Sequence, residues 1–361
     1  MRRFAMLLMI SLLLPIYALA APDIPYAADT VLQVDALTPA AQSLLDLIYP
    51  AIRNCEMSIT LPKRTLYDDA NAAMQCLSRN YPELFHLERT WSISYYQSEP
   101  QYAAGIQPSY SISAEEYNHL LTQLLSAAQA LADSAAGSQA DRAEYLHDVL
   151  CLRATYDYSE TGQMNNTVVG SLLMGATQCE GYAHALTLLY RLSGIPCGVV
   201  TGEAMDEWGP SRHAWNIAAI DGVSTLIDAT WNDQDSNYGV THWYYGLTTA
   251  MMAVDHMPDP ELAVPACHST AVNWHARRGL LLSNRDEILY ALGCFARDGE
   301  VSVRFTDAAM YADFRDRTND WFGEYNAACQ PENAFYGAYN MIFADQQLCL
   351  QLWRIKEDAV Q

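Results

Sequence analysis

The sequence is poor in basic residues. Only two of its 361 residues are lysines, Lys63 and Lys356, and 20 lysines and arginines stand against 42 aspartates and glutamates, a formal net charge of −22. Binding to nucleic-acid phosphates needs clustered Lys and Arg, so this balance excludes nucleic acid as the main partner. Because 51% of the residues are hydrophobic, the chain is not a disordered acidic tail and is long enough for two or three folded units.

A stretch able to span a membrane is also lacking. Arg2 and Arg3 precede an apolar run over 4–14, and Ala18-Leu19-Ala20 is a small-x-small cleavage site. This pattern is typical of a Sec-type signal peptide, and the run is shorter than the roughly 20 residues of a membrane helix. No cysteine follows the cleavage site, which argues against a lipoprotein. We therefore predict cleavage near Ala20, no membrane span afterwards, and a secreted or extracytoplasmic protein.

The number of cysteines is odd, at nine. A secreted protein permits disulfides, so eight of them could form up to four bridges, whose pairing the sequence does not determine. One thiol is left over, and a catalytic role would explain why it stays free.

Two segments with the same order of predicted elements flank the middle of the chain. The first has helices over 40–52 and 67–78, strands over 57–61, 91–96 and 106–112, and a break at Pro82-Glu83. The second has helices over 284–295 and 307–321, strands over 301–305, 335–343 and 348–353, and a break at Pro331-Glu332. The pattern indicates either a diverged repeat or ordinary alternation of elements.

The middle opens with two predicted helices. Ser113 with Glu116 forms the pattern of a capping box, apolar residues then recur at helical spacing, and Gly137 ends the helix. A second helix is expected after Ser138.

Cys179 stands at the start of a third predicted helix. Apolar residues recur at helical spacing over 183–192, and Gly194 before Ile195-Pro196 ends the helix. Free N–H groups and the dipole at a helix N-terminus favour an anion, which lowers the pKa of a thiol and makes it a better nucleophile. A buried structural cysteine is the alternative for this segment taken alone.

A predicted hairpin places a histidine and an aspartate on one face. Asp221-Gly222 is a favoured pair for a two-residue type I′ turn, which sets His213 opposite Thr230 and Trp215 opposite Asp228. His213 and Asp228 are then diagonal neighbours, about 7–8 Å apart or less, within side-chain reach. Together with Cys179, they fit the order nucleophile, base and orienting carboxylate.

Three blocks of the sequence resemble the transglutaminase-like superfamily: Cys179-Glu-Gly-Tyr-Ala, His213-Ala-Trp-Asn and Ile227-Asp-Ala-Thr-Trp. They occur in the family order and at the family spacing, within about 145–243. The resemblance implies an α+β fold with a papain-like core, in which Cys lies at a helix N-terminus and His and Asp lie on adjacent antiparallel strands. The Cys-Gly-Ser-Cys-Trp block of papain relatives is absent.

The resemblance also implies roles for these residues. Cys179 is the nucleophile, His213 the general base and acid, and Asp228 the residue that orients His213. The acyl-enzyme needs an oxyanion site, for which the Cys179 N–H supplies one donor. Related cores often carry an aromatic residue where Val169 stands, so the second donor stays open among Gln178, Asn165 and Asn166.

Further candidates surround these residues. Trp215, Trp208 and Gln178 are candidates for substrate binding, although tryptophans at such positions are also typical of a core. Glu180 and Asn216 are candidates for supporting the three residues. The group Cys267, His268, His256 and His275 matches no standard zinc spacing, so we predict no metal and no cofactor.

These observations predict four parts: a signal peptide over 1–20, an N-terminal accessory α/β unit over 21–112, a catalytic core over 113–260 and a C-terminal accessory α/β unit over 261–361. The expected function is a secreted thiol-dependent enzyme that hydrolyses peptide or carboxamide bonds of a protein or peptide substrate, with cell-wall or cell-surface components as candidate partners. Two alternatives stay open: a glutamine cross-linking transglutaminase, and a catalytically weak extracellular module that binds protein or glycan.

Overall fold

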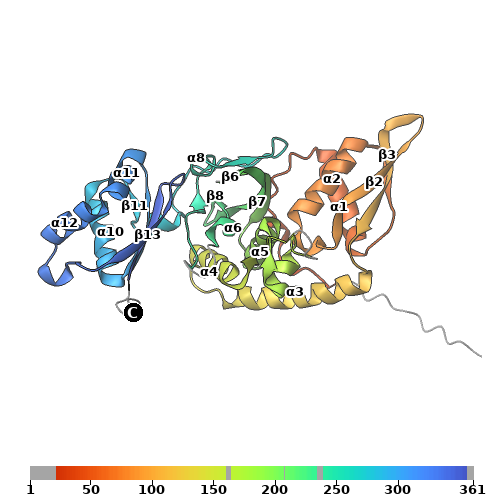
Figure 1. Cartoon of the computed structure of the whole chain (residues 1–361). Helices are drawn as coiled ribbons and strands as arrows, with labels where there is room; N and C mark the ends of the chain where they lie inside the picture. The colour runs from red at the N-terminus through yellow and green to blue at the C-terminus, as the bar shows by residue number, and fades with distance from the viewer. Residues whose placement is uncertain (1–21, 160–163, 207, 234–238, 356–361) are drawn as a thin grey trace, which may run out of the picture.

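The computed structural model describes residues 22–159, 164–206, 208–233 and 239–355. The predicted signal peptide lies outside these residues. Figure 1 shows three units in a row, each with its own β-sheet, and they follow one another in chain order. Within the described ranges, no helix has the length and apolar character needed to cross a bilayer.

The N-terminal unit packs two helices on a three-stranded antiparallel sheet. Its elements are α1 (Pro39–Arg53), β1 (Ile59–Leu66), α2 (Tyr67–Asn80), the 3₁₀ turn η2 (Pro82–Leu84), β2 (Leu87–Tyr96) and β3 (Glu99–Tyr110), with strand order β1-β3-β2. The predicted elements are present. The first strand runs five residues beyond the predicted end at Leu61, with a register shift between Thr60 and Thr65 where Arg64 takes a positive φ.

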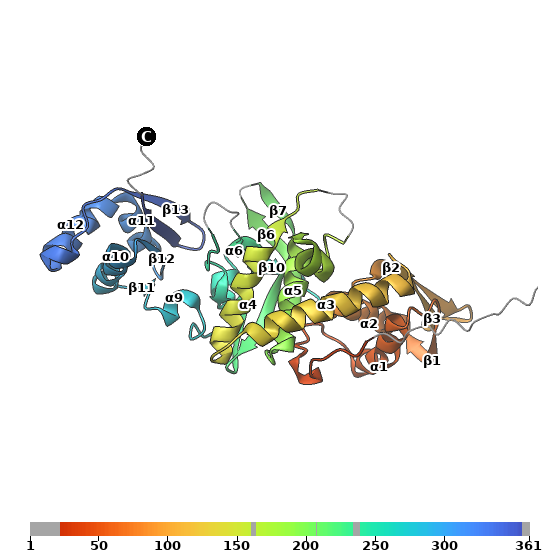
Figure 2. The same cartoon turned by 90° about the horizontal axis from the view of Figure 1, so that it is seen from below.

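The central unit places helices against a five-stranded antiparallel sheet. Its sheet has the order β10-β6-β7-β8-β9 and comprises β6 (Cys197–Asp206), β7 (Gly209–Ile220), β8 (Val223–Ile227), β9 (Tyr245–Leu247) and β10 (His256–Pro258). Its longer helices are α3 (Ala114–Ser134), α4 (Gln139–Arg153) and α5 (Cys179–Leu192). Figures 1 and 2 show α3 running along the central unit to the N-terminal unit.

Short elements complete this unit. They are β4 (Thr155–Tyr156), η3 (Gly170–Met174), β5 (Ala176–Thr177), α6 (Ala229–Asn232), α8 (Thr249–Met252) and α9 (Trp274–Arg277). At the start of α3, the Ser113 side chain accepts the Glu116 N–H at 3.2 Å, as expected of a helix cap. A reciprocal capping box with Ser138 and Asp141 starts α4.

The C-terminal unit has a four-stranded sheet of order β11-β12-β14-β13. Its elements are β11 (Leu281–Leu282), α10 (Arg285–Asp298), β12 (Glu300–Phe305), α11 (Ala308–Asp316), α12 (Thr318–Ala328), η4 (Pro331–Asn333), β13 (Tyr339–Ala344) and β14 (Cys349–Arg354). The single helix predicted over 307–321 is wrong: Arg317 leaves helical geometry, so the chain turns between Phe314 and Phe322, which both reach the core. The strand predicted from Phe335 begins at Tyr339, because Phe335 instead packs between Phe295 and Phe322.

The two outer units share one topology. In each, a helix, a strand, a second helical region, a proline-led 3₁₀ turn and two strands follow in order. The strand orders β1-β3-β2 and β12-β14-β13 correspond, and all these pairs are antiparallel. The C-terminal unit adds β11, which pairs in parallel with β12. This correspondence favours a diverged repeat over chance alternation.

Candidate active site

Cys179 is the first residue of α5. Gln178, which precedes it, has an extended backbone, and its N–H donates to the Asn165 carbonyl at 2.7 Å. The thiol is partly buried and packs near Val199 and Ala214 of the sheet. A side chain in this position lies at the positive end of the helix dipole, as the sequence predicts.

A glycine two residues further allows α5 to approach the preceding chain. A Cβ atom at Gly181 would lie 1.9 Å from Thr177 Oγ1 and 2.8 Å from the backbone oxygen of Thr167. Contacts this short do not occur between real atoms, so only glycine fits. The glycine of the Cys-Glu-Gly-Tyr-Ala block is therefore needed for the placement of Cys179.

Asn216 fixes the same helix to the sheet. Its buried amide nitrogen lies 2.9 Å from the Ala183 carbonyl and 2.9 Å from Thr187 Oγ1, both on α5, and 3.3 Å from the Gly198 carbonyl of β6. Asn216 thus holds α5 against two strands, which gives the predicted supporting residue a physical role.

The hairpin that carries His213 has the predicted turn. Asp221 and Gly222 both have positive φ angles, of 51° and 76°, as a type I′ turn requires, and the ladder pairs Asn216 with Ile227. The predicted pairings of Trp215 with Asp228 and of His213 with Thr230 are wrong, because β8 ends at Ile227. Asp228 instead caps α6: its Oδ1 accepts the Thr230 and Trp231 N–H groups at 2.9 and 3.2 Å.

His213 and Asp228 nevertheless meet. His213 Nε2 lies 2.7 Å from Asp228 Oδ2, and both side chains are buried. Burial alone would lower the pKa of His213, but the Asp228 carboxylate, with a further contribution from Cys179, raises it to about 10. Burial alone would raise the pKa of Asp228, but the neighbouring His213 holds it well below its usual range. The pair therefore favours an imidazolium beside a carboxylate, with the thiol close by.

A second histidine, His256 of β10, contacts the same carboxylate. Its Nε2 lies 3.1 Å from Asp228 Oδ2 and its Nδ1 lies 2.6 Å from Asp255 Oδ1. From the sequence, His256 was a candidate only for the group around Cys267 that matches no standard zinc spacing. The position of His256 beside Asp228 was missed because a strand of only three residues has no sequence pattern that places it at the edge of this sheet.

The remaining predicted residues take other places. Trp215, predicted to bind substrate, is 1% exposed and stacks on His213, so most of its ring packs in the core, and its remaining surface lines a cavity of about 280 Å³ beside His256. Trp208 is 88% exposed, between β6 and β7. The side-chain amides of Gln178 and Asn165 both donate to the Ser159 carbonyl, at 3.1 Å each, so they hold that loop; Asn166 lines a cavity beside α5.

The N-terminal unit reaches this site. Arg89 of β2 forms an ion pair with Glu180, the residue after Cys179. A cavity of about 380 Å³ lies between the two units, lined by Phe85, Leu87 and Arg89 on one side and by Asn166 and Glu180 on the other. Both units therefore line a cavity beside Glu180, the residue that follows Cys179.

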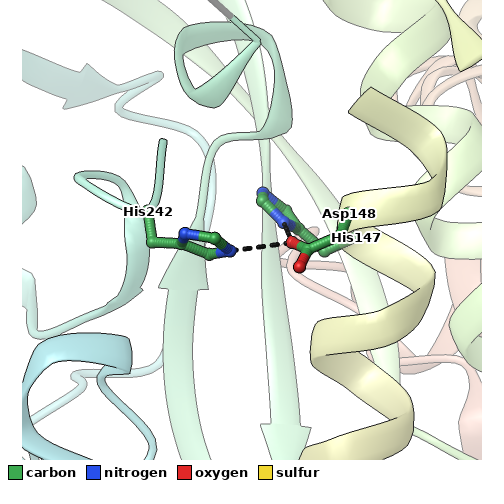
Figure 3. Close-up of side chains that lie close together, drawn as sticks. All are labelled: His147, Asp148 and His242. Carbon is green, nitrogen blue, oxygen red and sulfur yellow. Dashed lines mark hydrogen bonds and ion pairs between the residues drawn. The ribbon is translucent and has the colours of Figure 1, made fainter. Parts of the chain in front are cut away.

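Two groups of described residues carry metal-ligating atoms within 4.8 Å of one another: His213, Asp228 and His256, and the group His147, Asp148 and His242. Figure 3 shows the second group, in which Asp148 on α4 lies between the two rings, 2.8 Å from each. His147 Nε2 also contacts the Asn232 amide of α6 at 3.0 Å. Within each group the carboxylate is hydrogen-bonded to both histidine rings. Cys267, His268 and His275 belong to neither.

All nine cysteines, which all lie in the described part of the chain, are free thiols. Six of them are buried inside the units, as is Cys151, whose thiol lies 3.4 Å from the Ala229 carbonyl. The disulfides that a secreted chain permits are therefore not formed in this structure.

The model of the transglutaminase-like superfamily matches residues 126–232, from α3 to α6. The matched segment contains Cys179, His213 and Asp228 and ends before His256.

Individual relatives are distant. The kyphoscoliosis peptidase of Homo sapiens is 28% identical over 100 residues, and that of Mus musculus 27%; each match covers 23% of this chain and 15% of the relative. The chain thus spans only a small part of these relatives' length. Solved structures include a candidate cysteine protease from Cytophaga hutchinsonii (16% identity, TM-score 0.27, covering 39% of this chain and 61% of that one) and a TGase (12%, 0.28, 51% and 53%).

Proposed function

Because residues 126–232 belong to the transglutaminase-like superfamily, we propose that this chain is a thiol-dependent acyl-transfer enzyme that hydrolyses peptide or carboxamide bonds. The observation that carries the proposal is the buried His213–Asp228 pair beside Cys179 at the α5 N-terminus.

The chemistry follows from these groups. The Cys179 thiol passes its proton to His213, and the resulting thiolate adds to the carbonyl carbon of the substrate. The tetrahedral intermediate collapses, the C–N bond breaks, and His213 gives the proton to the leaving amine, which leaves a thioester on Cys179. Water then adds to the thioester while His213 accepts its proton. Collapse releases a carboxylic acid and returns the proton to the thiol.

The Asp228 carboxylate supports both half-reactions. It accepts the hydrogen bond of His213 Nε2, which orients the ring and stabilises the imidazolium that forms when Cys179 loses its proton. The backbone N–H of Cys179, at the first position of α5, is one donor for the oxyanion.

Hydrolysis is the favoured outcome because Cys179 is partly exposed, so water can reach a thioester there. Transfer to an amine, as in a protein cross-linking transglutaminase, needs that water to be excluded. The cavity between the N-terminal and central units supports a protein or peptide substrate. The N-terminal sequence supports action outside the cytoplasm, on peptide segments at a wall or surface.

Alkylation with iodoacetamide tests the proposal. Cys179 should react faster than Cys55 and Cys329, which are also partly exposed and serve as internal controls. His213→Ala should remove this difference. Equal labelling of the three thiols in the unchanged chain would contradict the enzyme and favour a binding module.

The reaction type is tested separately. A glutamine-containing peptide is incubated with the chain, with and without an added primary amine, and the products are weighed by mass spectrometry. Hydrolysis gives the acid in both samples, whereas an amine adduct as the main product would favour the transglutaminase.

A further inference from the structure

We infer that His256 is a positioning residue of the active site, which holds the Asp228 carboxylate in place and is itself held by the C-terminal unit. The inference rests on the proposed function and extends it to residues outside the matched segment 126–232.

The geometry of His256 carries the first step. Its side chain is fully buried, and its two ring nitrogens face two carboxylates: Asp228 Oδ2 at 3.1 Å and Asp255 Oδ1 at 2.6 Å. A carboxylate accepts hydrogen bonds, so a ring that serves both carboxylates donates from both nitrogens and carries a positive charge. A positively charged His256 also compensates the buried carboxylates of Asp228 and Asp255, each of which would be costly to bury without a cationic partner.

The second step concerns Asp228. Its Oδ1 accepts two backbone N–H groups of α6, and its Oδ2 accepts His213 and His256. Four hydrogen bonds use the main acceptor positions of a carboxylate, so the group has no alternative orientation. His256 therefore fixes the oxygen to which His213 donates, and fixing that oxygen fixes the His213 ring relative to Cys179.

The third step leads to the C-terminal unit. Asp255 Oδ2 accepts the Tyr244 hydroxyl at 2.8 Å and the Gln347 side-chain amide at 2.8 Å. Gln347 lies between β13 and β14 and is buried, and its own oxygen accepts Arg304 of β12 at 2.8 Å. A continuous chain of buried hydrogen bonds thus joins Asp228, His256, Asp255 and Gln347 across the contact of two units.

The backbone is adapted to this arrangement. β10 joins the sheet at the edge of β6, where Gly202 pairs with Pro258 of β10 and, on its other side, with His213 of β7. A Cβ atom at Gly202 would lie 2.1 Å from the Met257 carbonyl oxygen. The glycine therefore permits the close approach that brings His256 to Asp228.

Chemical rescue tests the role of His256. A cavity of about 280 Å³, lined in part by Trp215 and His256, offers an entry path for a small ring. With p-nitrophenyl acetate as the acyl donor, His256→Ala should lower kcat by about 10- to 100-fold with KM nearly unchanged. Added imidazole should restore part of kcat, whereas N-methylimidazole, which cannot donate from both nitrogens, should not. An unchanged kcat, or equal rescue by both compounds, would overturn the inference.

Gln347→Leu tests the link to the C-terminal unit and guards against loss of folding in His256→Ala. It should lower kcat several-fold without raising KM, with the circular dichroism spectrum unchanged. If His256→Ala does not fold and Gln347→Leu keeps the full kcat, the inference is wrong.

A failure of the inference can be distinguished from a failure of the proposed function by measuring the esterase activity that depends on Cys179. The activity of Cys179→Ala is the background for this measurement. Esterase activity in the unchanged chain no higher than that background would contradict the proposed function itself. Activity above the background that neither variant alters would contradict only the role of His256.

Discussion

At the scale of single residues, Asp228 makes contacts that serve both the fold and the candidate site. One fully buried carboxylate caps α6 and binds two histidines. Any replacement must supply acceptors in four directions, and an amide supplies only one oxygen.

Asp228→Asn keeps one acceptor oxygen that can cap α6 but removes the charged partner of His213 and His256, so we expect a less stable fold and a large loss of activity. The amide nitrogen faces hydrogen-bond donors, so His213 loses its orienting partner, and kcat for p-nitrophenyl acetate should fall by about 10³- to 10⁴-fold. Asp286→Asn, at a side chain 95% exposed, is the matched control and should keep the full rate. A decrease in kcat of less than about 10-fold, which corresponds to roughly 1.4 kcal/mol, would argue against an orienting role for Asp228.

His213 makes stability depend on pH. Its pKa is raised to about 10 in the folded chain, against 6.5 for the free side chain, because Asp228 outweighs the effect of burial. The folded state thus holds the proton more tightly. This contribution is complete below about pH 6.5 and is lost as the pH rises through about 10. Urea midpoints between pH 6 and 11 should fall more steeply for the unchanged chain than for His213→Gln; parallel curves would contradict the raised pKa.

The nine thiols give a direct chemical count. Since all nine are free, Ellman's reagent should titrate nine thiols in guanidinium chloride without prior reduction, and dithiothreitol should leave the thermal midpoint unchanged. A lower count that rises to nine after reduction would show disulfides that this structure lacks.

At the scale of elements, the sequence predicted those turns and helix caps that depend only on neighbouring residues. The Asp221-Gly222 turn and the Ser113 cap depend on neighbouring residues alone, and both are present. The break at Arg317 depends on packing, and the end of β8 at Ile227 depends on the Asp228 side chain that caps α6; hydrophobic periodicity predicts neither. Tertiary contacts override pattern at such places.

The site shows the same division. Cys179, His213 and Asp228 were predicted to act together because their blocks lie in elements with clear periodicity and a defined turn. His256 joins them through a short edge strand and Gln347 through another unit, and neither relation leaves a spacing in the sequence.

Gly181→Ala tests how tightly α5 is placed. The added methyl group meets Thr177 and the Thr167 backbone, so we expect a loss of about 1–3 kcal/mol in the free energy of unfolding, measured in urea. Gly323→Ala is the control, because this glycine lies in α12 with open space around its Cβ position. There the alanine should be neutral or stabilising by up to about 1 kcal/mol. Equal effects at both sites would show that α5 has room to move.

At the scale of the whole molecule, Arg191 joins the N-terminal and central units. Its guanidinium is 1% exposed and donates to the Asn80 carbonyl at 2.7 Å, to Asn80 Oδ1 at 3.0 Å and to the Cys197 carbonyl at 2.8 Å. Tyr26 and Tyr81 lie near it, with ring centroids 5.4 and 5.9 Å from the guanidinium carbon. One side chain on α5 thereby fixes the end of α2.

Arg191→Met should leave several buried acceptors without donors and cost about 3 kcal/mol or more of unfolding free energy. Limited proteolysis should then cut between the N-terminal unit and α3. Arg297→Met, which removes an exposed ion pair with Asp298, should leave the free energy of unfolding nearly unchanged, because solvent screens such a pair. If both variants resist the protease equally, the units are held together by other contacts.

Asp228 both caps α6 and pairs with His213, and these two roles affect how the residue is retained in evolution. A position that serves both architecture and reactivity is retained when only one of the two is selected. A descendant that had lost the thiol at position 179 would still need the carboxylate to start α6 and to neutralise His256. Among homologues of this chain, an aspartate at this position should therefore be retained more often than the cysteine. The presence of the aspartate alone is poor evidence that a relative is an enzyme.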